Sequence, residues 1–243
     1  MATDCRTCPL RKWPIFDPLT EAEISFMETF KSGELAITGG ATLMMEGSNS
    51  PQLFTVLEGM GLRYKTLPTG ERQVINFVFP GDFLGLQAGV MSEMQHSVEA
   101  TTPMRLCVFD RKSLWSLFEG HPDRAFDLTW IAAVEEHLLG ESLAIIGRMS
   151  GLERIARAFV RLYERGTAQG LVKDNEMPLP YKQHDLADAL GLSLVHTNKM
   201  LTRLRELGFA SWQGGRLKVL DYAALCELAQ LESDRAQVTR PLI

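Results

Sequence analysis

The sequence lacks any apolar run that approaches the ~18 residues of a membrane-spanning helix. Its first residues, MATDCRTCPLRKW, contain no apolar stretch of the kind that a signal peptide needs, so we expect a cytoplasmic protein. Only 4 cysteines occur among 243 residues, too few for a disulfide framework in a chain of this length. With 45% hydrophobic and 23% charged residues, the composition excludes a disordered or fibrous chain and indicates one large globular domain or two modest ones.

Sequence motifs of several enzyme classes are also missing. We find no phosphate-binding P-loop, no HExxH motif, no G-x-S-x-G motif and no spaced set of histidines and cysteines for zinc. There is no internal repeat and no low-complexity segment. We therefore expect no catalytic residues, no metal site and no cofactor.

An excess of positive charge is a third missing feature. The 25 Lys and Arg residues face 30 Asp and Glu residues, and the net charge of −5 by itself argues against a nucleic-acid partner. The charge is unevenly distributed, however: residues 1–120 carry −4, residues 121–148 carry −3 and residues 149–230 carry +2. The acidity therefore belongs to the first half and the middle of the chain.

The first half of the chain shows β-type patterning. Residues 20–32 predict a helix with Thr20 as its N-cap. From residue 33 to residue 108, short apolar runs are broken by Gly or Pro at nearly regular intervals, which is typical of an all-β sandwich or barrel. Residues 62–67 and 73–79 predict a hairpin around a Pro-Thr-Gly turn.

A long helix is predicted next, over residues 121–148. No proline occurs from Asp123 to Arg148, and apolar residues recur at spacings of three and four. This seam either packs on the β-domain or pairs with a second copy of the helix. We favour pairing, because a long helix that leaves a barrel has little else to cover both its faces. The seam residues are Trp130, Val134, Leu138 and Ile145.

Residues 183–208, QHDLADALGLSLVHTNKMLTRLRELG, follow the helix–turn–helix pattern. Gly191 stands where the first helix needs a left-handed residue to end, and Ser193 can cap the second helix. A small residue, Ala187, stands where the helices touch, and the segment GFASWQGGRLKVLD predicts a two-stranded wing. The second helix repeats its inner-face residues at helical spacing: Thr197, Met200, Leu201, Leu204 and Leu207.

The opposite face of the second helix predicts DNA contact. It is polar and basic, with side chains short enough to enter a major groove. An ordinary helical hairpin followed by a β-hairpin is the alternative, but turn glycine, small contact residue, apolar register and wing coincide here. The outer-face residues are Ser193, Val195, His196, Asn198, Lys199, Thr202 and Arg203.

With a barrel, a long helix and a winged helix in this order, the chain resembles the Crp/Fnr family of bacterial transcription regulators. The resemblance extends from about Cys5 to Leu228 and rests on the PGDFLGL motif of residues 80–86, on LERIA at 152–156 and on the helix–turn–helix. It implies an α+β fold and a homodimer that binds double-stranded DNA at an inverted repeat, with half-sites ~34 Å apart. It also implies an activator that contacts RNA polymerase. The expected parts are a β-barrel or jelly-roll sensor domain (1–120), a dimerisation helix (121–148), a winged helix–turn–helix domain (149–230) and a tail (231–243).

The residues that hold cAMP in other members of the family are missing. The position of the ribose-binding Glu is Leu86, and the positions of the phosphate-binding Arg–Ser pair are Met94 and Gln95. An apolar and an uncharged side chain cannot neutralise a buried phosphate. We therefore expect no cAMP response; the pocket is either a relic or takes an apolar or other effector.

The cysteines match only part of the iron–sulfur set of the oxygen-sensing Fnr branch. Cys5, Cys8 and Cys107 occupy three of its four positions, but the remaining one is Pro14, and such a cluster normally needs four cysteines. Three interpretations stay open. These cysteines hold a labile or incomplete iron–sulfur cluster, Cys5 and Cys8 form a redox pair, or the pair is vestigial and Cys107 is core packing, which we favour.

The resemblance also assigns DNA contacts. Where the cAMP-responsive branch reads guanine with an Arg–Glu pair, this chain has Leu194 and Val195, so that readout is lost. Lys199 keeps the second basic contact of the family and can reach guanine acceptors. Further positions match phosphate-contacting and wing residues: Lys182, His184 and Arg216.

A sequence-specific DNA-binding transcription regulator is the function we favour. One alternative is an oxygen- or redox-responsive regulator of the Fnr type that uses Cys5, Cys8 and Cys107. Another is a ligand-binding regulatory module that has lost DNA binding, but Lys199, Arg203 and the intact helix register weigh against it.

Overall fold

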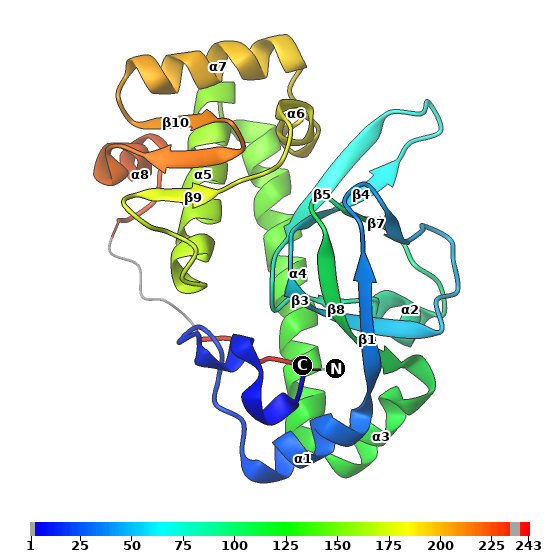
Figure 1. The fold of residues 1–243 in the computed structure, drawn as a ribbon. Coiled ribbons are helices and arrows are strands. Elements are labelled where there is room, and N and C mark those ends of the chain that lie inside the picture. Colours follow the sequence, from blue (N-terminus) through cyan, green and yellow to red (C-terminus); the bar gives the residue numbers. More distant parts are fainter. Residues whose placement is uncertain (1–2, 234–238) are drawn as a thin grey trace. The chain divides into compact units, whose positions relative to one another are not determined.

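The computed structural model describes residues 3–233 and 239–243, and its internal contacts divide the chain into two units (Figure 1). The first unit comprises Met1–Glu136 together with Thr239–Ile243, and the second comprises His137–Val238. Helix α4 (Pro122–Arg148) runs from the first unit into the second, with bounds close to the predicted 121–148. None of the described helices is long and apolar enough to cross a membrane.

The first unit is built on two four-stranded antiparallel sheets. The strands are β1 (Lys31–Ile37), β2 (Thr42–Met44), β3 (Gln52–Glu58), β4 (Gly61–Thr66), β5 (Arg72–Val78), β6 (Phe83–Leu84), β7 (Ser97–Ala100) and β8 (Met104–Asp110). One sheet has the order β1-β8-β3-β6 and the other β2-β7-β4-β5. The predicted hairpin is β4 and β5, in which Thr66 lies opposite Arg72. These sheets confirm the predicted all-β fold of the first unit, which is here named the sensor unit after its expected role.

Short helices surround the sandwich. They are the 3-10 helices η1 (Cys5–Thr7), η2 (Pro9–Lys12) and η3 (Arg111–Ser113) and the α-helices α1 (Glu21–Phe30), α2 (Leu86–Met91) and α3 (Leu114–Gly120). Helix α1 was expected, and Thr20 caps it: the Thr20 Oγ1 accepts from the Glu23 amide at 3.3 Å, and the Glu23 carboxylate accepts from the Thr20 amide at 2.7 Å. This reciprocal pair is a capping box, which fixes where the helix begins.

The first unit has two hydrophobic cores. One lies within the sandwich and includes Phe54, Leu84 and Leu106. The other joins residues of α1, β3 and β8 to α3 and the start of α4, and it also contains the last two residues of the chain, Leu242 and Ile243. The start of α4 is therefore part of the sensor unit's own packing.

The second unit contains the expected winged helix–turn–helix. Its elements are α5 (Gly151–Ala168), β9 (Glu176–Pro178), α6 (Gln183–Leu190), α7 (Leu194–Glu206), β10 (Ala210–Gln213), β11 (Arg216–Val219) and α8 (Tyr222–Leu228). Strands β10 and β11 are the predicted wing, with Gln213 opposite Arg216. The third strand of this sheet, β9, was not predicted, because its residues stand in a polar stretch that the sequence presents as a loop.

Candidate nucleic-acid interface

The turn between α6 and α7 is set by two residues. Gly191 ends α6 in the left-handed region, with φ of +62°, where a residue without a Cβ is favoured. Two residues later, the Ser193 Oγ accepts a hydrogen bond from the His196 amide at 3.2 Å and so caps α7. Both predicted turn residues are confirmed in these roles.

The inner face of α7 holds the helix against the rest of the second unit. Thr197 and Leu204 are buried, whereas three neighbours on this face are half-buried: Met200, Leu201 and Leu207. Arg154 of α5 fastens the turn, because its Nη1 donates to the Leu190 carbonyl at 3.0 Å and its Nε to the Met149 carbonyl at 2.9 Å. The predicted apolar register is confirmed, and it orients the outer face of α7 away from the body of the unit.

The outer face of α7 is exposed along its length. Val195 has 81% of its surface exposed. Further along the helix, five polar or charged side chains and Met200 line a hollow. Arg203 lies beside Glu206, with 3.6 Å between its Nη1 and the Glu206 Oε2, so part of its charge is balanced. The predicted residues exposed here are Ser193, Val195, His196, Asn198, Lys199, Thr202 and Arg203.

His196 differs from the others in where its ring lies. A Cβ built on Gly151 would be 2.3 Å from the His196 Nε2, so the ring packs against the first residue of α5. Gly151 leaves the room that the ring occupies. The sequence placed His196 among the outer-face residues, whereas the structure directs its side chain along the flank of α7 toward α5.

The remaining predicted contact residues lie at the rim of this surface. Lys182 and His184 are exposed at the start of α6. The buried Asp185 accepts from the Lys182 amide at 2.8 Å and lies 3.2 Å from the His184 Nε2. Arg216 of the wing forms an ion pair with Glu176 of β9. Sequence reasoning missed both carboxylates: an Asp three residues after a helix cap is a recognisable signal, but the Glu176 pair depends on an unpredicted strand.

The predicted effector positions do not meet in a polar pocket. Met94 is buried in the core of the sandwich, Leu86 packs against the other core, and Gln95 is exposed at the surface. The Gln95 amide donates to the side chain of Gln87 at 3.2 Å. Two of the three positions therefore contribute to packing.

A buried arginine, which the sequence analysis did not single out, connects the sensor strands to α4. The Arg63 Nη2 donates to the Phe83 carbonyl at 3.0 Å, and its Nη1 pairs with Glu135 of α4 at 3.0 Å. The sequence feature that could have indicated this arginine is its place in a predicted strand, directly after the apolar Leu62. Next to it, burial together with the Arg63 charge lowers the pKa of His96 to about 4, so this histidine is neutral near pH 7.

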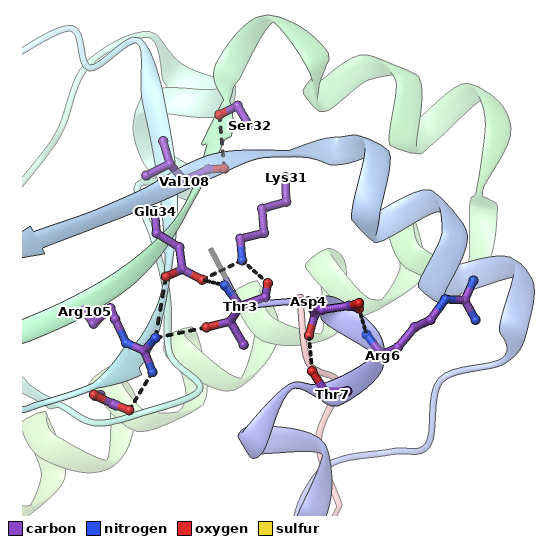
Figure 2. A network of polar contacts seen from close by, with 10 residues as sticks. Thr3, Asp4, Arg6, Thr7, Lys31, Ser32, Glu34, Arg105 and Val108 are labelled. Atoms are coloured by element: carbon purple, nitrogen blue, oxygen red, sulfur yellow. Dashed lines mark hydrogen bonds and ion pairs between the residues drawn. The ribbon is translucent and has the colours of Figure 1, made fainter. Parts of the chain in front are cut away.

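Three of the four cysteines gather at one place in the first unit. Cys5 and Cys8 pack against the core cluster that contains Cys107. An ion-pair network next to them fixes the N-terminal segment on β1 and β8 (Figure 2). In this network Lys31 donates to the Thr3 carbonyl at 2.6 Å and to Glu34 at 2.7 Å, and the Thr3 amide also donates to Glu34, at 2.6 Å.

The gathered thiols do not fit the family's iron–sulfur cluster. Three cysteines gather here, whereas such a cluster normally needs four. Burial raises the pKa of Cys107 to about 12 and also raises the pKa of Cys5, so both are thiols near pH 7. Within residues 3–233 and 239–243, no group of three or more His, Cys, Asp or Glu side chains is arranged to hold a metal ion. Cys226 is buried in the other unit.

Helix α4 exposes apolar residues on a second face, beside the one predicted for pairing. Trp130 packs against the core of the first unit, and the four predicted seam residues are all half-buried within the chain. The large apolar residues that α4 exposes are Phe126, Leu139 and Leu143, the last with 75% of its surface exposed. Small residues recur along α4 at heptad spacing, at Ala133, Gly140 and Gly147.

The arrangement defines a class of protein: a β-sandwich sensor unit, a long connecting helix, and a winged helix–turn–helix with an exposed second helix. Comparison with known proteins agrees with this class. Residues 34–121 match the family model of the cyclic nucleotide-binding domain, and residues 153–228 match that of the Crp-like helix-turn-helix domain.

Similar proteins cover most of the chain. It is 31% identical over 177 residues to the nitrogen fixation regulation protein FixK of Rhizobium meliloti, an alignment that spans 73% of this chain and 77% of FixK. It is 26% identical over 234 residues to the transcriptional activator protein FnrL of Cereibacter sphaeroides, spanning 95% and 93% of the two chains. The structure of FixK2 from Bradyrhizobium japonicum has the same fold, with a TM-score of 0.71 and 24% identity over 84% of this chain and 98% of that one. The chain belongs to the Crp/Fnr family of DNA-binding transcription regulators.

Proposed function

We propose that this chain acts as a homodimer that binds a specific inverted repeat in double-stranded DNA and activates transcription from it. The observation that carries the proposal is the outer face of α7. It exposes Asn198, Lys199 and Thr202 on a helix whose opposite face is fixed by buried residues. Such a helix can enter a major groove, where amide and ammonium groups read base edges.

The exposed face of α4 supports the homodimer. Leu139 and Leu143 with the small residues between them form a stripe on which a second copy of the helix can pack closely. A two-fold dimer would place two copies of α7 in successive major grooves, which is why we propose an inverted repeat as the site.

The direction of regulation is supported by the name of one relative. FnrL is named a transcriptional activator, which supports activation. We further propose that the chain contacts RNA polymerase and acts in the bacterial cytoplasm. The burial of Met94 and the packing of Leu86 support a sensor unit that does not respond to cAMP. Calorimetry with cAMP should detect no binding, and saturable binding would contradict this part of the proposal.

In-vitro selection from random DNA tests the proposal directly. The purified chain should enrich one sequence motif with two-fold symmetry and half-sites about one helical turn apart. Enrichment of an unpaired half-site would contradict the dimer. No enrichment above the starting pool would contradict sequence-specific binding.

A second candidate is regulation by oxygen or redox state through Cys5, Cys8 and Cys107, and the gathering of these cysteines in one cluster favours it. We propose no iron–sulfur cofactor, because three cysteines gather here and such a cofactor normally needs four. Protein purified without oxygen should contain no stoichiometric iron or sulfide, and selection with and without air should give the same motif. Stoichiometric iron with sulfide would favour the second candidate.

A further inference from the structure

The last described residues of the chain, which follow the DNA-binding unit in sequence, are built into the sensor unit. The Arg240 amide donates to the Ile15 carbonyl at 2.8 Å, and the Arg240 carbonyl accepts from the Asp17 amide at 3.0 Å. These two bonds form a short parallel bridge beside Phe16. In Figure 1 the segment runs along the N-terminal 3-10 helices.

Side chains of Thr239–Ile243 also contact the sensor unit. The Arg240 Nη1 pairs with the Asp82 Oδ1 at 3.2 Å, and the guanidinium lies 5.8 Å from the centre of the Phe16 ring. Leu242 and Ile243 are only 5% and 4% exposed and belong to the core that includes the start of α4. An exposed tail would leave these apolar side chains in water, so burial favours the docked state.

Backbone carbonyls of the segment are also used by buried polar groups of the sensor unit. The Leu242 carbonyl accepts from the Arg124 Nη1 of α4 at 3.3 Å. The Ile243 carbonyl accepts from the Thr55 hydroxyl of β3. Removing the segment would leave both donors buried without these partners, which is costly.

The chain leaves the DNA-binding unit at an equally definite point. The Arg157 Nη1 of α5 donates to the carbonyls of Ala229 and Gln230, at 3.0 and 3.3 Å. Eight residues, 231–238, then connect Gln230 to Thr239. A connector of this length reaches at most about 30 Å even when fully extended.

The DNA-binding unit is therefore tied to the sensor unit at two places, through α4 and through this connector. We propose that Thr239–Ile243 are a strap that limits the positions available to the DNA-binding unit and thereby prepares the dimer for DNA. This inference rests on the proposed function for its effect on DNA. A restrained pair of binding units loses less freedom when both half-sites are occupied, so it binds more tightly.

Lengthening the connector distinguishes a tail that restrains the DNA-binding unit from a tail that only adds packing to the sensor unit. We would insert about 10 and about 20 Gly and Ser residues between Glu232 and Ser233 in the full chain. The tail should stay docked, with slow hydrogen exchange at the Arg240 and Asp17 amides, while the restraint is lost. Small-angle scattering of the free protein should show a larger and more variable size, and affinity for the selected site should fall roughly fivefold or more with the longer insert.

The same insert in the exposed turn at Thr69–Gly70 of the β4–β5 hairpin is the matched control, because no tether crosses that turn. It should leave affinity unchanged. Unchanged scattering after the connector insertion would overturn the strap whether or not the protein binds DNA. Unchanged or tighter DNA binding with altered scattering would overturn its preparing role. Altered scattering in a protein that selects no DNA motif at all would count against the proposed function and leave the restraint standing.

Discussion

At the scale of single residues, Lys199 is the side chain on which base recognition depends most directly. It is exposed on the outer face of α7, and an ammonium group there can donate to the acceptors of guanine. Lys199→Ala should weaken binding to the selected site by ~1–3 kcal/mol and relax the preference at one position of each half-site. Titration of matched and singly changed DNA sites measures both effects.

Arg205→Ala is the charge-matched control for that experiment. Arg205 also lies on α7 but lines a hollow with Trp212 and Gln213 of the wing, to which Lys199 does not contribute although Asn198 and Thr202 do. Its loss should weaken all sites alike without relaxing any position. His196→Ala should change affinity by less than ~0.5 kcal/mol, because the ring packs on Gly151. Equal loss of preference in the Lys199 and Arg205 variants would contradict the assignment.

His96 makes the stability of the sensor unit depend on pH. Only 9% of its surface is exposed, and burial lowers its pKa from 6.5 to about 4. Between these values the unfolded chain binds a proton that the folded chain does not. The contribution of the neutral His96 to the free energy of unfolding is therefore fully present above pH 6.5. It is lost as the pH drops toward 4 and below, by up to about 3 kcal/mol. Urea unfolding at several pH values measures this, and His96→Gln should flatten the dependence. If the free energy of unfolding of that variant depends on pH as steeply as before, the pH dependence comes from other groups.

Residues whose role is local could be predicted from the sequence, and residues whose role is tertiary could not. Gly191, Ser193 and Leu204 act through helix ends and helix periodicity, which neighbouring residues determine. His196 carries the same periodicity as the other outer-face residues, yet its contact is with a glycine 45 positions earlier in the sequence. Nothing in the local pattern records that contact.

At the scale of elements, α4 shows the same distinction. Its length and bounds follow from the absence of proline, but its apolar residues lie on more than one face, and only packing decides which of them stay exposed. Trp130 is taken up by the sensor core, and Leu143 is left exposed. The predicted seam therefore packs partly within the chain, and the exposed stripe becomes the candidate pairing face.

Leu143→Glu tests that stripe. The side chain is exposed in the single chain, so the substitution should leave the unfolding free energy of the chain nearly unchanged. A carboxylate facing its own copy across a two-fold axis should raise the dimer dissociation constant roughly tenfold or more. Sedimentation equilibrium measures the change.

Trp130→Ala provides the contrasting variant on the same helix. Because Trp130 packs on the core of the first unit, its truncation should lower the stability of that unit by about 2–4 kcal/mol. A dimer that resists Leu143→Glu would rule out the exposed stripe as the pairing face.

Two elements could not be predicted for physical reasons. Strand β9 contains three residues, ends in proline and pairs along its length with β11, which lies about 40 residues later in the sequence. Helix α2 begins after a left-handed glycine without a side-chain cap, and its six residues contain two that favour other conformations, Gly89 and Val90. Both elements exist because the fold supplies partners far away in the sequence.

At the scale of the whole molecule, the net charge of −5 conceals a basic DNA-binding unit. The structure adds that some of its cations are already paired within the chain. Arg216 is held by Glu176, and Arg203 lies beside Glu206. These pairs reduce the positive charge that can neutralise phosphates, so affinity for unrelated DNA should be weak and specificity must come from two copies of α7 acting together.

Glu176→Gln tests how far this internal pairing limits DNA binding. The substitution frees the Arg216 guanidinium at the wing, where it can neutralise a phosphate. Affinity for unrelated DNA should rise. The plot of log affinity against log salt concentration should steepen by about 0.9 for each subunit bound, because each freed Arg216 neutralises one more phosphate. Glu227→Gln makes the same charge change at an exposed position of α8, away from the wing. If both variants steepen the salt dependence equally, the gain comes from overall charge, and the Glu176–Arg216 pair does not restrain the wing.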